Sequence, residues 1–298
     1  MCGFKLCFFL FCGKSKEHLF FLFLIFSLRE VYINRGISAI NLIRVIRYQK
    51  KSVRIHVISG KALILHQKNL VMKLKWWKIL CIVFLFITFT AGFLIHVPMV
   101  GNLHQSIRNF FFHVPMWFGQ MGLLTLSLAY SIAYLRTQNL RYDIYASELA
   151  KTGIIFGLLG LATGSIWAKY TWGEFWSNDP KQIAAAIAVL IYLAYLVLRG
   201  SMTDMDKKAR VTAVYNIFAY FIYIPLIMIL PRMVQSLHPG GMEGAKGGGN
   251  PALGGGSLDA TMEMIFWPAV FGWLLLGIWI SSLKIRLSLL ANKNVIHE

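Results

Sequence analysis

Residues 77–97, WKILCIVFLFITFTAGFLIHV, decide the class of fold, because Lys78 is their only charged residue. A lipid hydrocarbon core is about 30 Å thick and an α-helix rises about 1.5 Å per residue, so about 20 apolar residues cross it. Five further stretches of this kind follow. The six lie near residues 77–97, 112–135, 149–168, 182–199, 211–230 and 264–283.

These stretches are predicted to be helices, because every backbone polar group inside lipid must be bonded within its own segment. The alternating pattern of a membrane barrel, in strands of about ten residues, does not occur. The expected fold is therefore all-α, a polytopic membrane helix bundle with six transmembrane helices.

The composition of the whole chain agrees with a lipid environment. The chain is 57% hydrophobic, has a mean hydropathy of +0.60 and is only 14% charged, against about 25% in an ordinary soluble domain. Its net charge is +18, but no basic run is interleaved with aromatic residues on a soluble segment. No nucleic-acid partner is therefore expected, and the charge is better interpreted as a topology signal.

The Lys and Arg residues are distributed unevenly among the segments that flank the six stretches. From residue 72 onward, the start of the first stretch, the second and fourth connections with the adjoining ends of the stretches, and the C-terminal tail hold 13 of them, and the other three connections hold 5. The positive-inside rule assigns the richer set to the cytoplasm. We therefore expect a multi-pass inner-membrane protein whose core termini are cytoplasmic and whose first, third and fifth connections face the outer, periplasmic side.

The first 71 residues do not continue this pattern. The apolar run at 19–26 is too short to span a bilayer, and no convincing cleavage site of a signal peptide follows it. Residues 72–77, MKLKWW, are typical of the N-terminus of a membrane protein. The expected organisation is a poorly defined extension over 1–71, hypothesised to be a start-site artefact with translation from Met72, and a six-span domain over 72–298.

The third connection is unusually aromatic. Residues 167–182 read WAKYTWGEFWSNDPKQ, which concentrates more aromatic residues in one compact connection than an interfacial belt usually does. Trp172 and Trp176 are four residues apart, so on a helical turn they would share one face. Such a face beside a membrane is a platform for a flat, hydrophobic ligand.

The end of this connection predicts the start of the fourth helix. Asp179 is a candidate N-cap, Pro180 suits the first helical position, and Gln182 falls where the partner in a capping box would lie. We therefore interpret Asp179 chiefly as a helix cap.

Four histidines fall on the predicted outer side: His96, His104, His113 and His238. A lone interfacial histidine is more often a polar anchor than a ligand, but their shared side of the membrane favours ligation. A neutral imidazole is a good axial ligand for heme iron.

Two other patterns exclude classes of site. Residues 240–256 are rich in glycine, but no strand precedes them and no Gly-Lys-Ser/Thr follows, so they indicate a flexible linker and not a phosphate-binding loop. The four cysteines form no C-x-x-C pair, which argues against a disulfide scaffold or a zinc site. The absence of C-x-x-C-H excludes covalent attachment of heme to this chain.

Residues 172–181, WGEFWSNDPK, resemble the tryptophan-rich "WWD" signature, W-G-x-x-W-x-W-D-P-K, of heme-handling proteins. With six spans and an outward histidine on each side of the motif, residues 72–285 resemble the heme exporter protein C (CcmC) family. Asn178 departs from the pattern, because it replaces the third Trp of the family and removes one aromatic surface.

The resemblance implies transient, non-covalent binding of heme b at the outer face. The residues that match the family's platform and its two iron ligands are Trp172, Gly173, Trp176 and Asp179, and His113 and His238. It also implies partners in cytochrome c biogenesis, namely a membrane-anchored heme chaperone and the subunits of an ABC-type transporter complex. We expect a carrier and not an enzyme, because no nucleophile–base arrangement or hydrolytic carboxylate pair occurs.

Other classes of membrane protein require different sequence features. A cytochrome b-like redox enzyme needs histidine pairs inside the spans, which this sequence lacks. A permease or channel usually needs ionisable residues along its pathway, and the predicted spans hold almost none. A membrane subunit whose Trp-rich loop docks a partner without binding heme stays open, because interfaces also favour Trp.

Overall fold

The structure of the protein is a computed structural model, in which residues 75–97, 101–234, 236–238 and 259–292 are described. Six of its helices are long and apolar enough to cross a membrane, which confirms the prediction of an all-α bundle with six spans. They are α5 (Trp76–Leu94), α6 (Phe110–Thr137), α7 (Leu140–Trp172), α8 (Pro180–Gly200), α9 (Met205–Ile224) and α11 (Ala260–Ala291). The predicted extension over 1–71 and the glycine-rich linker over 240–256 lie outside the described residues.

Several helices are longer than their apolar stretches. Helix α7 was predicted near 149–168 but has 33 residues, a length of about 50 Å, whereas the hydrocarbon core needs about 30 Å. Its polar first turns are helical because the side chain of Asn139 accepts a hydrogen bond from the backbone N–H of Arg141. Hydropathy marks only the part of a helix that faces lipid, so it misses such capped ends.

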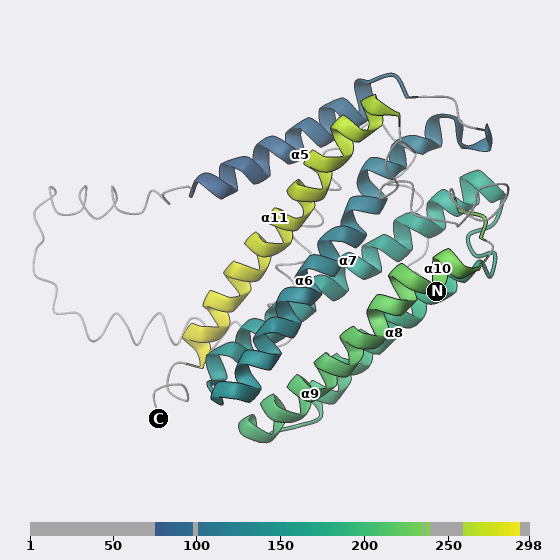
Figure 1. The fold of residues 1–298 in the computed structure, drawn as a ribbon. Coiled ribbons are helices and arrows are strands. Elements are labelled where there is room, and N and C mark those ends of the chain that lie inside the picture. The colour runs from purple at the N-terminus through teal and green to yellow at the C-terminus, as the bar shows by residue number, and fades with distance from the viewer. Residues whose placement is uncertain (1–74, 98–100, 235, 239–258, 293–298) are drawn as a thin grey trace, which may run out of the picture. The chain divides into compact units, whose positions relative to one another are not determined.

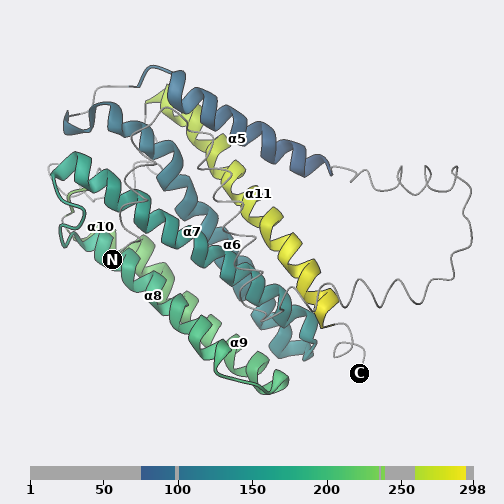
Figure 2. The same cartoon turned by 180° about the vertical axis from the view of Figure 1, so that it is seen from behind.

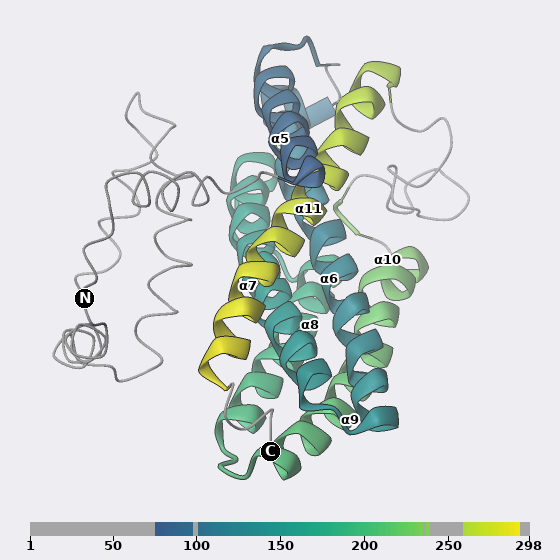
Figure 3. The ribbon, with the colours of Figure 1, turned by 90° about the vertical axis from the view of Figure 1, so that its left-hand side faces the viewer.

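Helices α6 and α7 form the central pair of the bundle. Helix α11 packs on both of them and carries α5 on its other side, while α8 and α9 pack against each other and against the opposite side of the pair. Figure 1 and the reverse view in Figure 2 show α5 beside α11 on one side and α8 beside α9 on the other. The same two views show α6 and α7 between these pairs, and Figure 3, turned by 90°, shows α11 running across α6 and α7.

The close contact between α6 and α7 rests on a row of glycines on α7. A Cβ added at any of them would meet one side chain of α6 at 3.0 Å or less, and the successive partners are Leu124, Gln120, Trp117 and His113 for Gly153, Gly157, Gly160 and Gly164. Glycines at this spacing let two helices approach closely inside a membrane. The row therefore fixes where the first turn of α6, with His113, lies against α7.

Helix α9 continues through a short π-helical turn, η2 (Pro225–Ile229), into α10 (Leu230–Met233). Pro225 has no N–H to donate and its ring collides with the carbonyl four residues earlier, which widens the helix at this point. The backbone N–H of Leu230 then bonds to the carbonyl of Pro225. The fifth predicted span, near 211–230, is therefore helical but irregular, and the backbone becomes extended at Val234 on its way to His238.

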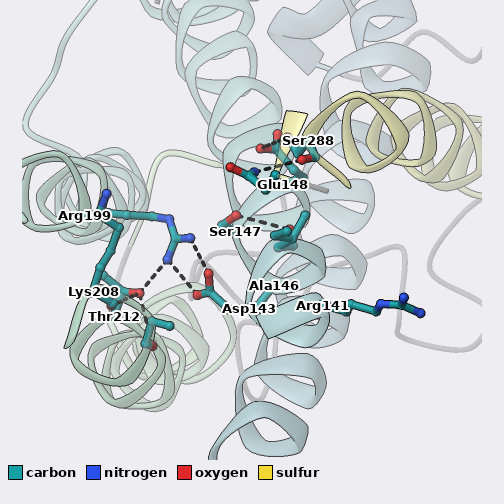
Figure 4. Close-up of polar contacts among 12 residues, drawn as sticks. Arg141, Asp143, Ala146, Ser147, Glu148, Arg199, Lys208, Thr212 and Ser288 are labelled. Atoms are coloured by element: carbon teal, nitrogen blue, oxygen red, sulfur yellow. Dashed lines mark hydrogen bonds and ion pairs between the residues drawn. The ribbon is translucent and has the colours of Figure 1, made fainter. Parts of the chain in front are cut away.

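The end of α7 farthest from Trp172 holds a buried ionic cluster. The guanidinium of Arg199 on α8 donates to both carboxylate oxygens of Asp143, at 2.7 and 2.5 Å, and to the hydroxyl of Thr212 on α9. Figure 4 shows this three-helix contact beside Glu148, which accepts a hydrogen bond from Ser288 of α11. The cluster ties four helices together at that end of the bundle.

Candidate functional site

A cavity at the C-terminal end of α7 contains both of the predicted histidine ligands. Its enclosed space is small, about 20 Å³, and the cavity is partly open to the surroundings. Its walls come from α6, α7, the 3₁₀ turn η1 (Gly101–Asn109) and the segment after α10. The lining residues are Leu103, His113, Gly164, Trp167, Ala168, Thr171, Trp172 and His238.

His113, in the first turn of α6, is held through its Nδ1 atom. This atom lies 3.0 Å from the hydroxyl oxygen of Thr163 on α7. The Thr163 hydroxyl donates its own hydrogen to the carbonyl of Leu159, at 2.9 Å, so it accepts from the imidazole. The hydrogen-bond network therefore assigns the ring hydrogen of His113 to Nδ1 and leaves the lone pair on Nε2.

Trp167 and Gly164 fix the remaining freedom of the His113 ring. The ring of Trp167 meets it edge-on, with centroids 5.8 Å apart, and the indole N–H of Trp167 is bonded to Ser106 of η1 at 3.1 Å. A Cβ at Gly164 would lie 2.7 Å from Cε1 of His113. Only a residue without a side chain leaves room for the imidazole there.

His238 is held in the same manner by Asp179. Its Nδ1 atom lies 2.9 Å from Oδ1 of Asp179, and an ionised carboxylate only accepts, so Nδ1 carries the hydrogen. The ring of Trp172 meets His238 edge-on, with centroids 4.8 Å apart. In the neutral ring, the lone pair of His238 is therefore also on Nε2.

Asp179 has the cap function that the sequence predicts, because its Oδ1 accepts from the backbone N–H of Lys181 at 2.9 Å. It also accepts from the hydroxyl of Ser236 and from the backbone N–H of Leu237. Burial raises the pKa of Asp179, but hydrogen bonds from His238, Ser236 and Leu237 outweigh it and hold the pKa well below its usual range. Asp179 thus stays ionised and joins α8 to the segment after α10.

The expectation that Trp172 and Trp176 share a helical face is wrong. Helix α7 ends at Trp172, and Gly173 follows with a φ of 87°, a left-handed conformation that favours glycine. Trp172 therefore lines the cavity, whereas Trp176 lies outside it with 41% of its surface exposed. Of the two, only Trp172 is placed to contact a ligand in this cavity.

Asn178 and Gln182 shape the loop instead of the cavity. Asn178 has a φ of 54°, which asparagine tolerates better than most residues, and its Oδ1 accepts from the indole N–H of Trp176 at 3.0 Å. Gln182 does not form the predicted capping box, because its Oε1 accepts from the backbone N–H of Ser177 at 3.0 Å. Both contacts stabilise the turn that leads into Asp179.

Of the other two histidines predicted on the outer side, His96 does not line the cavity. His96 follows the last turn of α5 and is exposed, and it is absent from the cavity lining. The side chain of His104 lies outside the described residues. Sequence reasoning missed Thr163 and Ser236, which have no recognisable local signal, and Gly164, which the spacing of glycines on α7 would have indicated.

A comparison with known proteins identifies the family. The family model described as heme exporter protein C matches residues 62–295. The chain belongs to this family. The match confirms the resemblance to this family and covers the six helices of the described structure that are long and apolar enough to cross a membrane.

The similar proteins carry two names. The heme exporter protein C of Haemophilus influenzae is 26% identical over 186 residues, 62% of this chain and 72% of that protein. That of Bradyrhizobium diazoefficiens is 29% identical over 161 residues, 52% of this chain and 56% of that protein. The cytochrome c biogenesis protein CcsA of Cuscuta reflexa is 27% identical over 169 residues, 56% of this chain and 51% of that protein. The match thus spans little more than half of the latter two relatives.

Proposed function

We propose that this chain acts in cytochrome c biogenesis by binding heme b at the outer face of the inner membrane and passing it to a membrane-anchored heme chaperone. One observation carries the proposal: His113 and His238, from distant parts of the sequence, line one cavity together with Trp172. Each histidine is bonded through Nδ1, so each has Nε2 available for iron.

The chemistry of the cavity suits heme as a cargo. Heme is a flat, apolar disc, and two neutral imidazoles can hold its iron without a covalent bond to the ring. Trp167 and Trp172 supply aromatic walls, and aromatic contact contributes about 0.5–1.5 kcal/mol per pair beyond area burial. Because the cavity is small and partly open, most of the disc would lie at the protein surface, where a chaperone can take it.

The wider setting of the proposal comes from the charge pattern and the family. The excess of Lys and Arg on the segments that join the other ends of the helices supports an outer location for the cavity. Relatives named heme exporter protein C support heme as the ligand. Subunits of an ABC-type transporter complex are proposed partners on the resemblance to the family, and we propose a carrier without enzymatic activity of its own.

Optical spectra of detergent-purified protein test the proposal. We expect the wild type, oxidised and reduced, to show a bis-histidine heme spectrum that is lost or altered in His113→Ala and in His238→Ala. His96→Ala is the matched control, because His96 is an outer histidine away from the cavity, and its spectrum should equal that of the wild type. Heme that persists unchanged in both ligand variants would contradict the ligand assignment.

A second candidate function is favoured by the exposed rings beside the cavity. Tyr170, Phe175 and Trp176 are all exposed although they lie in or next to the Trp-rich loop, and exposed aromatic residues are frequent at protein interfaces. In this alternative the loop docks a partner and the chain binds no heme itself. A wild-type protein that takes up no heme even after supplementation would support it over the heme carrier.

A further inference from the structure

Three aspartates cap membrane-spanning helices in the described structure, and one of them differs from the others. Asp204 and Asp259 are exposed, and the cap bond of each comes from one backbone N–H at the start of α9 or α11. Asp179 makes the same kind of bond at the start of α8 but is only 3% exposed. A cap alone needs neither this burial nor more than one acceptor oxygen.

The additional contacts of Asp179 all come from three consecutive residues after α10. The backbone N–H of Leu237 donates to Oδ2 at 2.6 Å, and Nδ1 of His238 donates to Oδ1 at 2.9 Å. The hydroxyl of Ser236 donates to the carboxylate, at 2.8 Å from Oδ2, and accepts from the backbone N–H of His238 at 3.2 Å. One carboxylate therefore determines both the path of this segment and the orientation of its imidazole.

We propose that Asp179 is a positioning residue for heme binding, which fixes the tautomer and the ring orientation of His238 so that Nε2 faces the cavity. This inference rests on the proposed function. Asp179 itself does not line the cavity, so it acts through His238. In this role the helix cap of α8 and the iron ligand share one carboxylate.

The geometry explains why the carboxylate matters and a neutral acceptor would not replace it. Oδ1 accepts from the backbone N–H of Lys181, and Oδ2 accepts from the backbone N–H of Leu237. An asparagine has one oxygen, so it would leave one of these two N–H groups without an acceptor, or turn its own N–H₂ group toward Nδ1 of His238. If the N–H₂ group donates to Nδ1, it stabilises the tautomer that carries the hydrogen on Nε2, and a protonated Nε2 cannot bind iron.

The proposal also has an electronic consequence. A carboxylate that accepts the Nδ1 hydrogen of a metal-bound imidazole makes that ligand more basic, and loss of such a partner typically lowers metal affinity about 10- to 100-fold. A more basic ligand stabilises ferric over ferrous iron. Asp179 therefore lowers the reduction potential of the bound heme, while His113, whose partner is the neutral hydroxyl of Thr163, contributes less to this effect.

Asp179→Asn tests the inference, with Asp259→Asn as the matched control because both aspartates cap a long helix. We expect Asp179→Asn to bind heme about 10- to 100-fold more weakly and to shift the reduction potential of the remaining heme to a more positive value. Asp259→Asn should leave both quantities unchanged. If Asp179→Asn keeps the affinity and the potential of the wild type, Asp179 is only a cap and the inference is overturned.

A measurement on the heme-free wild type keeps the inference testable if Asp179→Asn does not fold. Nitrogen NMR of ¹⁵N-histidine-labelled protein, with the His238 signals assigned by their loss in His238→Ala, reports which ring nitrogen carries the hydrogen. We expect Nδ1; a hydrogen on Nε2 would overturn the inference. This result does not depend on heme, so a wild type that binds no heme contradicts the proposed function separately.

Discussion

A buried aspartate lies near each end of α7 and joins distant segments of the chain. The two aspartates differ in whether their partner side chain keeps an atom that can bind a ligand. At one end, Asp143 receives two bonds from the guanidinium of Arg199, which also bonds to Thr212. At the other end, Asp179 accepts one hydrogen bond from Nδ1 of His238. His238 lines the cavity, and its second ring nitrogen, Nε2, is not used in this bond.

The difference follows from the partner and not from the carboxylate. A guanidinium has only donors and stays cationic, so a bidentate pair with a carboxylate is complete in itself. A neutral imidazole has one donor and one acceptor, so a carboxylate that binds the donor defines where the lone pair points. A buried aspartate therefore has only a structural role beside arginine, whereas beside histidine it also prepares a ligand site.

The largest expected effect is on stability, at the end of α7 where Asp143 pairs with Arg199. Arg199→Leu leaves the carboxylate of Asp143 buried without its partner, and breaking such a pair costs about 3–5 kcal/mol in the free energy of unfolding. Denaturant unfolding in detergent measures this loss. The control is Arg141→Leu, since Arg141 is exposed and points away from the cluster in Figure 4. A loss for Arg199→Leu as small as that of the control would mean that the two ends do not differ as described.

The second largest effect is expected for Gly164→Ala, on heme affinity at the cavity. The new Cβ would lie 2.7 Å from Cε1 of His113, so the imidazole must move, and overpacking of this kind costs about 1–3 kcal/mol. We expect heme affinity, measured by titration, to fall roughly 5- to 150-fold, the factor that corresponds to this cost. Gly200→Ala is the control, because nothing lies within 4 Å of its added Cβ. Equal affinities in both variants would contradict the assigned position of His113.

Substitutions of the two tryptophans of the motif should lower heme affinity less, and to different extents. Trp172→Leu removes the ring that contacts His238, and we expect heme affinity to fall by up to about tenfold, the upper end of an aromatic contact. Trp176→Leu should change it about twofold or less, because Trp176 lies outside the cavity. Heme titrations of both variants check this order. The reverse order would show that the platform extends over the loop.

Among the variants at residues that contact the two histidines, Thr163→Val should have the smallest effect. It preserves the shape of the side chain but removes the hydroxyl that accepts from His113, and a neutral hydrogen bond contributes about 0.5–1.5 kcal/mol. We expect heme affinity to fall by a few-fold, less than for Asp179→Asn at the other histidine. A titration of both variants under the same conditions makes the comparison, and a larger loss for Thr163→Val would reverse the roles of the two histidines.

Some of the site was predictable because its signals are local. The cap at Asp179 depends on the next three residues, so the Asp-Pro pair indicated it correctly. The Trp-rich motif predicted the loop. The spacing of Trp172 and Trp176 wrongly predicted a shared helical face, because Gly173 ends the helix between them. Thr163 and Ser236 could not be predicted, since a hydroxyl in a sequence does not reveal which distant histidine it will contact.

The sequence by itself determined the six helices and their apolar faces, because a backbone inside lipid has no partner except its own segment. It also determined the family, through a motif of consecutive residues and a match over most of the chain. Only the tertiary structure decided that His113, Trp172 and His238 line one cavity and that Asp179 serves both a helix and a histidine. These contacts arise where α6, α7, α8 and the segment after α10 meet, and no local pattern records how separate helices pack.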